Sequence, residues 1–219
     1  MTLRAVLPLC VLVGLLAGGT RTAGQPRQMI KGWGEVQDPD GDCQVRATDT
    51  HLTIGIPGSL HDLWPKEGKV NAPRVLQDVD GDFTVQVTVT TTVKPQNGFF
   101  RAATLLVVQD DGTFIRFDDA AADRGASGID FYCYLHVFRN GDRLVNEQLR
   151  PLKDAPTVLK LQRHGGDVIA SFSQDDGRTW RSFGQKTAQL SQRLKAGVAA
   201  LNNTNSPFTA TFADLKITK

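Results

Sequence analysis

The chain has 219 residues, of which 40% are apolar and 22% are charged, with 25 Lys and Arg against 23 Asp and Glu. This near balance excludes the strongly basic composition with which nucleic-acid-binding proteins neutralise phosphates, and the apolar fraction is too high for a disordered chain. The length suits one domain with a substantial core.

Residues 1–23 have the pattern of a secretory signal peptide. Arg4 supplies an early positive charge, residues 5–18 form an almost unbroken apolar run, and small residues follow. The run is short for a membrane span, although a retained anchor is the alternative. We expect cleavage near Ala23, a secreted or periplasmic location, and a single domain over 24–219 without a membrane span. Removing the leader takes away two arginines and no acid, which leaves 23 basic and 23 acidic residues.

The rest of the chain alternates between strand-like and turn-like sequence. Residues 84–93 carry valines on one face and Thr or Gln on the other, which is the period of a strand. Only 187–195 has a weak helical pattern. The strands expected from these patterns are 43–47, 51–56, 84–93, 103–109, 113–117, 128–139, 144–149, 157–163, 167–174, 197–201 and 208–218. About ten strands separated by Gly, Asn and Asp turns predict an all-β fold, a two-sheet antiparallel β-sandwich or jelly roll.

Two of these strands carry side chains suited to binding. Segment 131–138 places Tyr134 and His136 on the face opposite to core-type residues, and segment 114–118 does the same for Arg116. If the two strands are neighbours, these three side chains line one open face. Aromatic rings beside Arg and His are typical of saccharide grooves, because flat rings cover the C–H faces of sugars and planar polar groups hydrogen-bond to hydroxyls.

Two further residues complete the predicted binding face. Gln86 lies on the polar side of its strand, and Trp64 would provide an aromatic platform from a loop. The alternative is that these side chains merely decorate an outer sheet face and that Trp64, between Leu63 and Pro65, is a buried loop anchor.

Two acidic segments share one pattern, Asp38-Pro-Asp-Gly-Asp42 and Asp78-Val-Asp-Gly-Asp82. Carboxylates on a turn can supply the oxygen ligands of Ca²⁺, but the positions at which an EF-hand needs Gly and Glu hold other residues. An Asp-Gly turn before a strand explains both segments more simply. The sequence shows no CxxC, HExxH or Cys/His cluster, so we predict no metal site and no cofactor, with Ca²⁺ as the one cation that these turns suggest.

Cys43 and Cys133 remain after removal of the leader. In an oxidising compartment they could form one disulfide, and the alternative is two separate thiols that behave as small apolar groups. The sequence leaves both alternatives open.

Catalytic patterns are sparse. Glycosidases need two carboxylates at a defined separation, and the three glutamates of this chain are not spaced for that role. Asp118 and Asp119 follow a predicted strand, but neighbouring residues point to opposite faces. We therefore expect no catalytic residues. If the protein is an enzyme after all, a glycoside hydrolase that uses Asp118 or Glu147 is the expectation.

One turn has a recognisable signature. Ser173-Gln-Asp-Asp-Gly-Arg-Thr-Trp180 fits S-x-D-x-G-x-T-W, the Asp-box of sialidase-type propellers, in which Ser and Asp fix a hairpin turn above the Trp. The pattern occurs once, so we predict the turn and not a propeller.

The order of several motifs carries a family resemblance. NAPRVLQDVDGDF starts at Asn71 and SFSQDDGRTW at Ser171, with supporting segments at 105–114, 159–167, 197–200 and 212–217. Together they resemble the DUF1349 family, which is related to fungal "regulation of enolase" proteins within the concanavalin A-like lectin/glucanase superfamily. The resemblance covers about residues 33–218. It implies a two-sheet jelly roll with one concave face, where relatives often bind carbohydrate, and it brings no defined catalytic residues.

We therefore predict a secreted, non-catalytic, lectin-like module whose partner is a carbohydrate or glycoconjugate rather than nucleic acid. Its contacts would be Trp64, Arg116, Tyr134 and His136. The alternatives are a protein-interaction or structural domain of the envelope, with an exposed aromatic face as the partner surface, and a hydrolase acting on sugars. Fold analogy alone does not decide among them.

Overall fold

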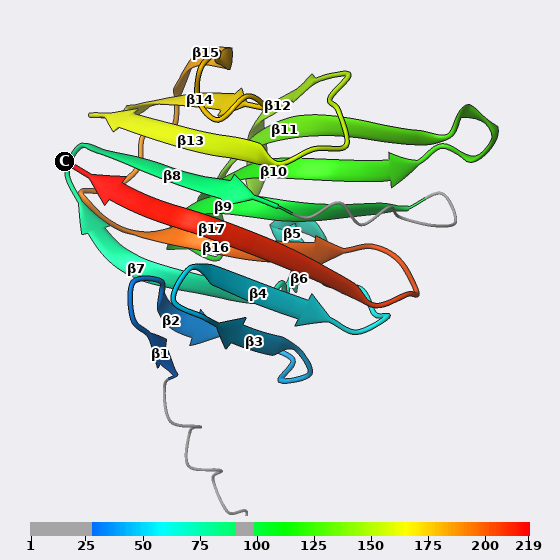
Figure 1. Ribbon diagram of the computed structural model, residues 1–219. Coiled ribbons are helices and arrows are strands. Elements are labelled where there is room, and N and C mark those ends of the chain that lie inside the picture. Colours follow the sequence, from blue (N-terminus) through cyan, green and yellow to red (C-terminus); the bar gives the residue numbers. More distant parts are fainter. Residues whose placement is uncertain (1–27, 91–98) are drawn as a thin grey trace, which may run out of the picture.

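The computed structural model describes residues 28–90 and 99–219. Two large antiparallel sheets pack face to face (Figure 1), which confirms the predicted β-sandwich, and two further short strands form a small sheet of their own. The predicted signal peptide, residues 1–23, lies outside the described residues. Within the described part of the chain, no helix is long and apolar enough to cross a membrane.

The eight-stranded sheet has the order β1 (Met29–Ile30), β2 (Gly34–Gln37), β7 (Arg74–Asp80), β16 (Arg193–Asn202), β9 (Phe100–Asp110), β10 (Thr113–Asp123), β11 (Ile129–Arg139) and β12 (Asp142–Leu149). The seven-stranded sheet has the order β15 (Arg181–Thr187), β14 (Asp167–Ser173), β13 (Thr157–His164), β8 (Phe83–Val89), β17 (Phe208–Thr218), β4 (His51–Ile56) and β3 (Gln44–Ala47). The short pair is β5 (Leu63–Trp64) and β6 (Lys69–Val70), and the two 3₁₀ turns are η1 (Pro65–Glu67) and η2 (Gly125–Ser127).

Most of the expected strands are confirmed, β4 and β17 with the predicted bounds. The weak helical pattern at 187–195 is wrong, because β15 ends at Thr187 and β16 begins at Arg193. Strand β10 continues to Asp123, well beyond the expected end at residue 117. Strand β7 was not predicted, since consecutive residues at its start are all buried and therefore break the period of two.

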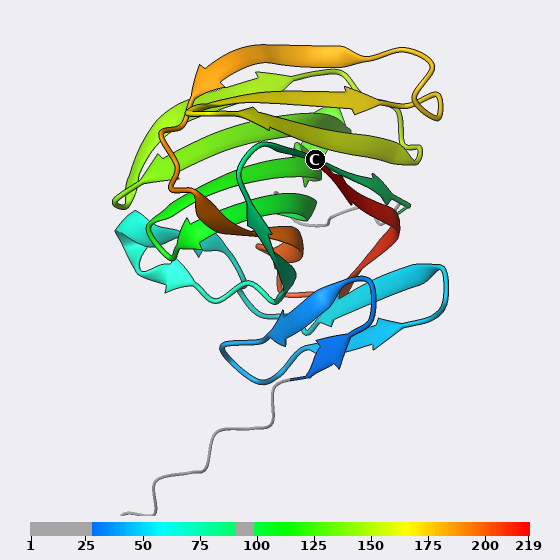
Figure 2. The ribbon, with the colours of Figure 1, turned by 90° about the vertical axis from the view of Figure 1, so that its left-hand side faces the viewer.

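The core lies between the two sheets. Alternate side chains of β8 and β11, such as Val85, Val87, Cys133 and Leu135, are fully buried there. The opposite face of the eight-stranded sheet is also buried, in a second apolar cluster that includes Leu106, Phe114, Phe138 and Leu201. Leu63 of β5 belongs to this cluster, and Figures 1 and 2 show β5 and β6 on the side of this sheet that faces away from the seven-stranded sheet. The candidate site described below lies on this second buried face of the eight-stranded sheet.

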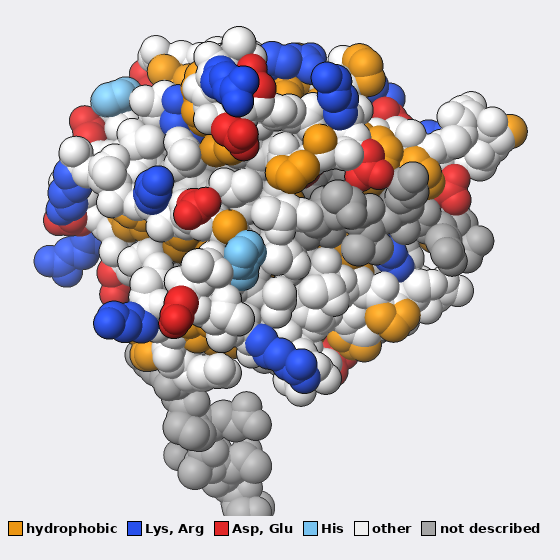
Figure 3. Space-filling model, in the orientation of Figure 1, with side chains coloured by type: hydrophobic (Ala, Val, Ile, Leu, Met, Phe, Trp, Pro, Cys, Tyr) orange, Lys and Arg blue, Asp and Glu red, His pale blue; other side chains and the backbone are white. Residues whose placement is uncertain are grey.

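The outer face of the seven-stranded sheet differs from this buried face. Figure 3 shows it covered mainly by uncharged polar side chains and backbone, with scattered charges. Gln86 lies there, because β8 pairs with β13 and β17 in that sheet. The prediction that Gln86 shares a face with Arg116 and His136 is therefore wrong, since alternation alone does not say which sheet a strand joins.

The predicted turns are confirmed. Asp175 accepts hydrogen bonds from Ser173 Oγ at 2.7 Å and from Thr179 N at 2.8 Å, and Trp180 Nε1 donates to the Gly177 carbonyl at 3.0 Å. Both acidic segments end shortly before a strand, and Gly41 and Gly81 adopt φ of +72° and +67°.

The two cysteines of the described chain do not form a disulfide. Cys43 and Cys133 are free thiols, one half-buried beside β3 and one fully buried in the inter-sheet core.

We expect Gly197→Ala to destabilise the fold, because a Cβ at this position in β16 would lie 2.1 Å from the Val75 carbonyl oxygen. Overpacking of this kind costs about 1–3 kcal/mol or more, and urea denaturation measures it. Gly166→Ala is the matched control, since its added Cβ meets nothing within 4 Å. Equal midpoints for both variants would contradict this account of β16.

Candidate functional site

A cavity of about 110 Å³ lies on the outer face of the eight-stranded sheet, beside β5. All four residues predicted from the sequence line it, and the complete lining is Asp62, Trp64, Phe100, Arg116, Asp118, Ala120, Tyr132, Tyr134, His136 and Arg143. A larger, open depression near β1 has Trp33 as its one buried lining residue. The smaller cavity is therefore the better candidate for a binding site, because buried charged and aromatic side chains line it.

The register of the sheet explains why these side chains meet. Arg116 in β10 pairs with His136 in β11, and Asp118 pairs with Tyr134. Their side chains project from the same face because each pair lies directly opposite and successive pairs are two residues apart. Trp64 reaches the cavity from β5, and its ring lies edge-on to His136 at 5.7 Å between centroids.

Arg116 is the most heavily bonded residue of the cavity. Its side chain is 3% exposed, Nε donates to Asp118 Oδ2 at 2.7 Å, and Nη1 donates to Asp62 Oδ1 at 2.8 Å. Thr104 Oγ1 donates to the other Asp118 oxygen at 2.7 Å. Burial raises the pKa of Asp118, and the charge of Arg116 and the Thr104 hydroxyl oppose this effect. The three charged groups thus form a buried ion-paired triad, Asp62–Arg116–Asp118.

His136 is buried but has no hydrogen-bond partner. Its side chain is 2% exposed, and neither ring nitrogen has a partner in the structure. Burial, with the nearby charges of Arg116 and Arg143, lowers the pKa of His136 to about 2. The imidazole is therefore neutral, with one N–H donor and one lone-pair acceptor. Buried polar atoms without a partner are rare, and each costs about 1–3 kcal/mol.

Aromatic rings form the remaining wall. The rings of Tyr134 and His136 are perpendicular, with centroids 4.1 Å apart. The Tyr134 hydroxyl donates a hydrogen bond to Asn146 of β12. The neighbouring Tyr132 is buried, which raises the pKa of its hydroxyl to about 12. The Arg143 guanidinium lies 4.7 Å above the centre of the Trp64 ring. Trp64 is half-buried and lines the cavity, so it is not the buried loop anchor of the alternative interpretation.

The predicted open, exposed face is wrong in one respect. Tyr132, His136 and Phe138 are all buried, because β5 and its surroundings cover the aromatic face of the sheet. Asp62, Phe100, Ala120 and Arg143 also line the cavity and were not predicted from the sequence. Asp62 lies in an irregular segment without alternation, and Phe100 opens a strand that was expected to start at residue 103.

The acids considered for catalysis do not form a pair. Asp118 is held by Arg116, whereas Glu147 bonds Lys186 of β15 at 2.7 Å and does not line the cavity. Asp119 lies on the opposite face of β10 from Asp118, as neighbouring strand residues must, and it does not line the cavity either.

Comparison with known proteins identifies the family. Residues 48–219 match the model of the family described as "Protein of unknown function (DUF1349)", and the chain belongs to this family. The resemblance predicted from the motifs is thus confirmed. A search of curated proteins finds no match.

Solved structures share the fold at low sequence identity. A functionally unknown protein from Saccharomyces cerevisiae has a TM-score of 0.66 and 16% identity, over 80% of this chain and 91% of that chain. A β-glucanase from Bacillus licheniformis has a TM-score of 0.50 and 13% identity, over 88% and 94%. Basic winged bean lectin, solved with Tn-antigen, has a TM-score of 0.50 and 8% identity, over 82% and 92%. These likenesses support the concanavalin A-like jelly roll.

We expect Arg116→Ala to destabilise the protein by about 3–5 kcal/mol, because it leaves two buried carboxylates without their counter-charge. The measurement is urea denaturation. Arg143→Ala, at an exposed position of the same cavity, should cost less than about 1 kcal/mol. An Arg116→Ala midpoint equal to that of the wild type would contradict the triad.

Because of His136, the stability of the fold should decrease as the pH falls. Its pKa in the fold is lowered to about 2 from the ordinary 6.5, so below pH 6.5 the unfolded chain binds a proton that the folded chain refuses. This residue's contribution to stability is therefore lost progressively as pH falls from 6.5. The melting temperature of the wild type should drop more steeply between pH 7 and pH 4 than that of His136→Leu; parallel curves would exclude this role.

Proposed function

We propose that this DUF1349 protein is a secreted, non-catalytic, lectin-like module that binds a saccharide in the cavity formed by Trp64, Arg116, Tyr134 and His136. The observation that carries the proposal is the pair of unpartnered ring nitrogens of buried His136. A ligand that provides hydrogen-bond partners for both nitrogens would remove the free-energy cost of leaving them unpaired.

The chemistry of the cavity matches a sugar hydroxyl. A neutral imidazole presents one donor and one acceptor that point in different directions, and a hydroxyl group can either donate or accept, so two hydroxyls of a sugar would supply both partners. The rings of Trp64, Phe100, Tyr132 and Tyr134 can cover the apolar C–H face of a sugar ring. Three of the four charged lining groups, Asp62, Arg116 and Asp118, already bond to one another. The fourth, Arg143, lies over the Trp64 ring, so a neutral ligand can be accommodated.

The size of the cavity points to a short ligand. Sites for drug-sized molecules measure about 300–1,000 Å³, and this cavity has a volume of about 110 Å³. It suits one sugar unit or the end of a glycan better than a long polysaccharide segment. The likeness of the fold to a lectin solved with Tn-antigen supports a carbohydrate ligand, and the signal-peptide pattern of residues 1–23 supports an extracellular location.

The competing functions have weaker support. Hydrolysis needs a carboxyl group free to exchange a proton, and both cavity carboxylates are bonded to Arg116. A protein-interaction surface would need a contiguous apolar patch. The aromatic face that was expected to supply such a patch is covered, since Tyr132, His136 and Phe138 are all buried.

A glycan array on the purified protein tests the proposal, with His136→Leu as the diagnostic variant. We expect saturable, sugar-specific binding by the wild type and its loss in His136→Leu. The variant should melt at the same temperature as the wild type or higher at pH 7, because leucine removes two buried unpartnered atoms.

Gln86→Ala is the matched control, since this polar residue lies on the other sheet, and its binding should be unchanged. A blank array for the wild type, or undiminished binding by a folded His136→Leu protein, would overturn the proposal.

A further inference from the structure

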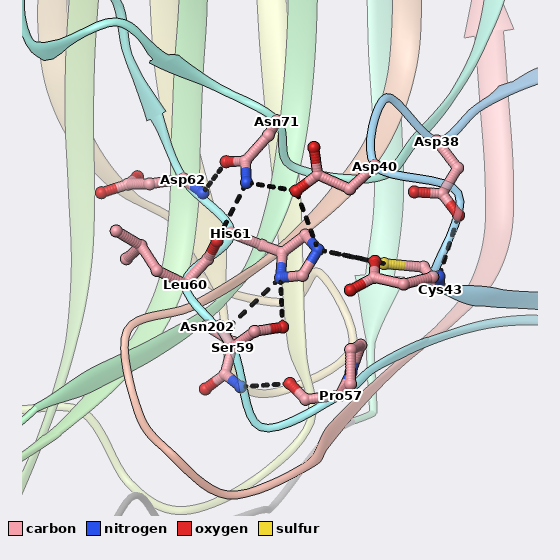
Figure 4. A network of polar contacts seen from close by, with 11 residues as sticks. Asp38, Asp40, Cys43, Pro57, Ser59, Leu60, His61, Asp62, Asn71 and Asn202 are labelled. Atoms are coloured by element: carbon pink, nitrogen blue, oxygen red, sulfur yellow. Dashed lines mark hydrogen bonds and ion pairs between the residues drawn. The ribbon is translucent and has the colours of Figure 1, made fainter.

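The chain segment that supplies Asp62 to the cavity turns the preceding side chain, His61, toward a different cluster. His61 is 1% exposed and lies against the turn that contains Asp38, Asp40 and Cys43 (Figure 4). Its Nε2 is 3.5 Å from Cys43 Sγ and 3.0 Å from Asp42 Oδ1, and Cys43 Sγ is 3.3 Å from the same carboxylate oxygen. His61 is 18 positions from Cys43 and 19 from Asp42 in the sequence. The fold nevertheless brings together a sulfur, a nitrogen and an oxygen atom that can each bind a metal ion.

These separations match the edges of a tetrahedral metal site. Zinc ligands lie at about 2.3 Å for sulfur and about 2.0–2.1 Å for nitrogen and oxygen. Tetrahedral angles then place sulfur about 3.5 Å from the nitrogen and oxygen donors, and those donors about 3.3 Å from one another. The three observed distances of 3.5, 3.3 and 3.0 Å come within about 0.3 Å of these values. The donors need almost no movement to surround one ion.

The other ring nitrogen of His61 is already committed. Nδ1 lies 3.2 Å from the carbonyl oxygen of Ser59, and an oxygen of this kind can only accept a hydrogen bond. The Asp42 carboxylate 3.0 Å from Nε2 can also only accept. A bound ion would therefore take the place of a proton on Nε2, while Nδ1–H donates to the Ser59 carbonyl. A metal-binding histidine is typically oriented by such a hydrogen bond to a carbonyl.

The acidic groups of the cluster have no lysine or arginine partner. In the described part of the chain, no Lys or Arg forms an ion pair with Asp38, Asp40 or Asp42. Asp38 Oδ1 is a buried oxygen with no hydrogen-bond partner.

We propose that Asp42, Cys43 and His61 bind a divalent transition-metal ion of the zinc type, with a fourth position open beside Asp40. Asp40 Oδ2 lies 3.7 Å from His61 Nε2 and accepts a hydrogen bond from Asn71 Nδ2 at 2.7 Å. Thiolate and imidazole donors select zinc over Ca²⁺, which takes oxygen ligands. Binding converts the thiol into a metal-bound thiolate and releases its proton to solvent.

The expectation of no metal site rested on sequence spacing, and this proposal replaces it. Cys43 and His61 are too far apart in sequence for a zinc-finger pattern, and the fold closes the gap. The His61 backbone pairs with Asn202 of β16, so an ion here would join the turn before β3 to the segment that holds Asp62 against Arg116. The inference does not depend on saccharide binding.

Titration of the chelator-treated protein with Co²⁺ and Zn²⁺ tests the proposal. We expect one equivalent of either metal to bind, with a thiolate-to-cobalt charge-transfer band and the intense visible bands of tetrahedral Co²⁺. Zinc should raise the melting temperature and release a proton that a pH indicator detects. Cys43→Ser should abolish the charge-transfer band and weaken zinc binding by more than about 100-fold, the upper end of what losing a supporting hydrogen bond costs such sites.

Asp80→Asn is the matched control, because it alters the second acidic turn with the same D-x-D-G-D pattern, and it should bind as the wild type does. Cys43 is only half-buried, so its serine variant should fold; a normal melting curve at zero metal checks this. The proposal would be overturned if wild-type protein gave no thiolate band, if Cys43→Ser bound zinc equally well, or if a tenfold excess of Ca²⁺ displaced the metal.

Discussion

The burial of Arg116 is the constraint on which the site depends. The eight-stranded sheet is covered on both faces, so a guanidinium at its centre must find opposite charge inside the protein. One partner, Asp118, comes from the same strand, and the other, Asp62, comes from a distant segment. The ion pair with Asp62 therefore fixes that segment against the sheet, places Trp64 at the cavity and encloses His136. The ion pair of Asp62 with Arg116 thus closes the cavity around His136, whose ring nitrogens have no hydrogen-bond partner.

A single stretch of chain, residues 59–64, connects the two sites that we propose. Asp62 bonds Arg116 in the cavity, whereas His61 contacts Asp42 and Cys43 in the turn before β3. Asn71 links both sides, because its Oδ1 accepts from the Asp62 backbone and its Nδ2 donates to Asp40 and to the Leu60 carbonyl. An ion at His61 would thus restrict the movement of the cavity wall, and a ligand in the cavity would meet a preorganised site.

Much of the fold could be predicted from the sequence, because strands with one buried face keep a period of two. That pattern placed Arg116, Tyr134 and His136 on one face of neighbouring strands, as the structure confirms. It failed where both faces are buried, as in β7, and where sheet membership mattered, as for Gln86. Asp62 and the Cys43–His61 contact could not be predicted, since they lie in irregular segments whose approach depends on the folded sandwich.

The most direct test of the account concerns the ring nitrogens of His136. Long-range ¹H–¹⁵N NMR of the histidine side chains, with His136→Leu to assign the signals, reports which nitrogens carry protons. The account predicts one protonated and one unprotonated nitrogen at pH 5, both of which shift when the saccharide selected by the array is added. A doubly protonated ring at pH 5, or signals that do not move while the saccharide binds, would contradict it.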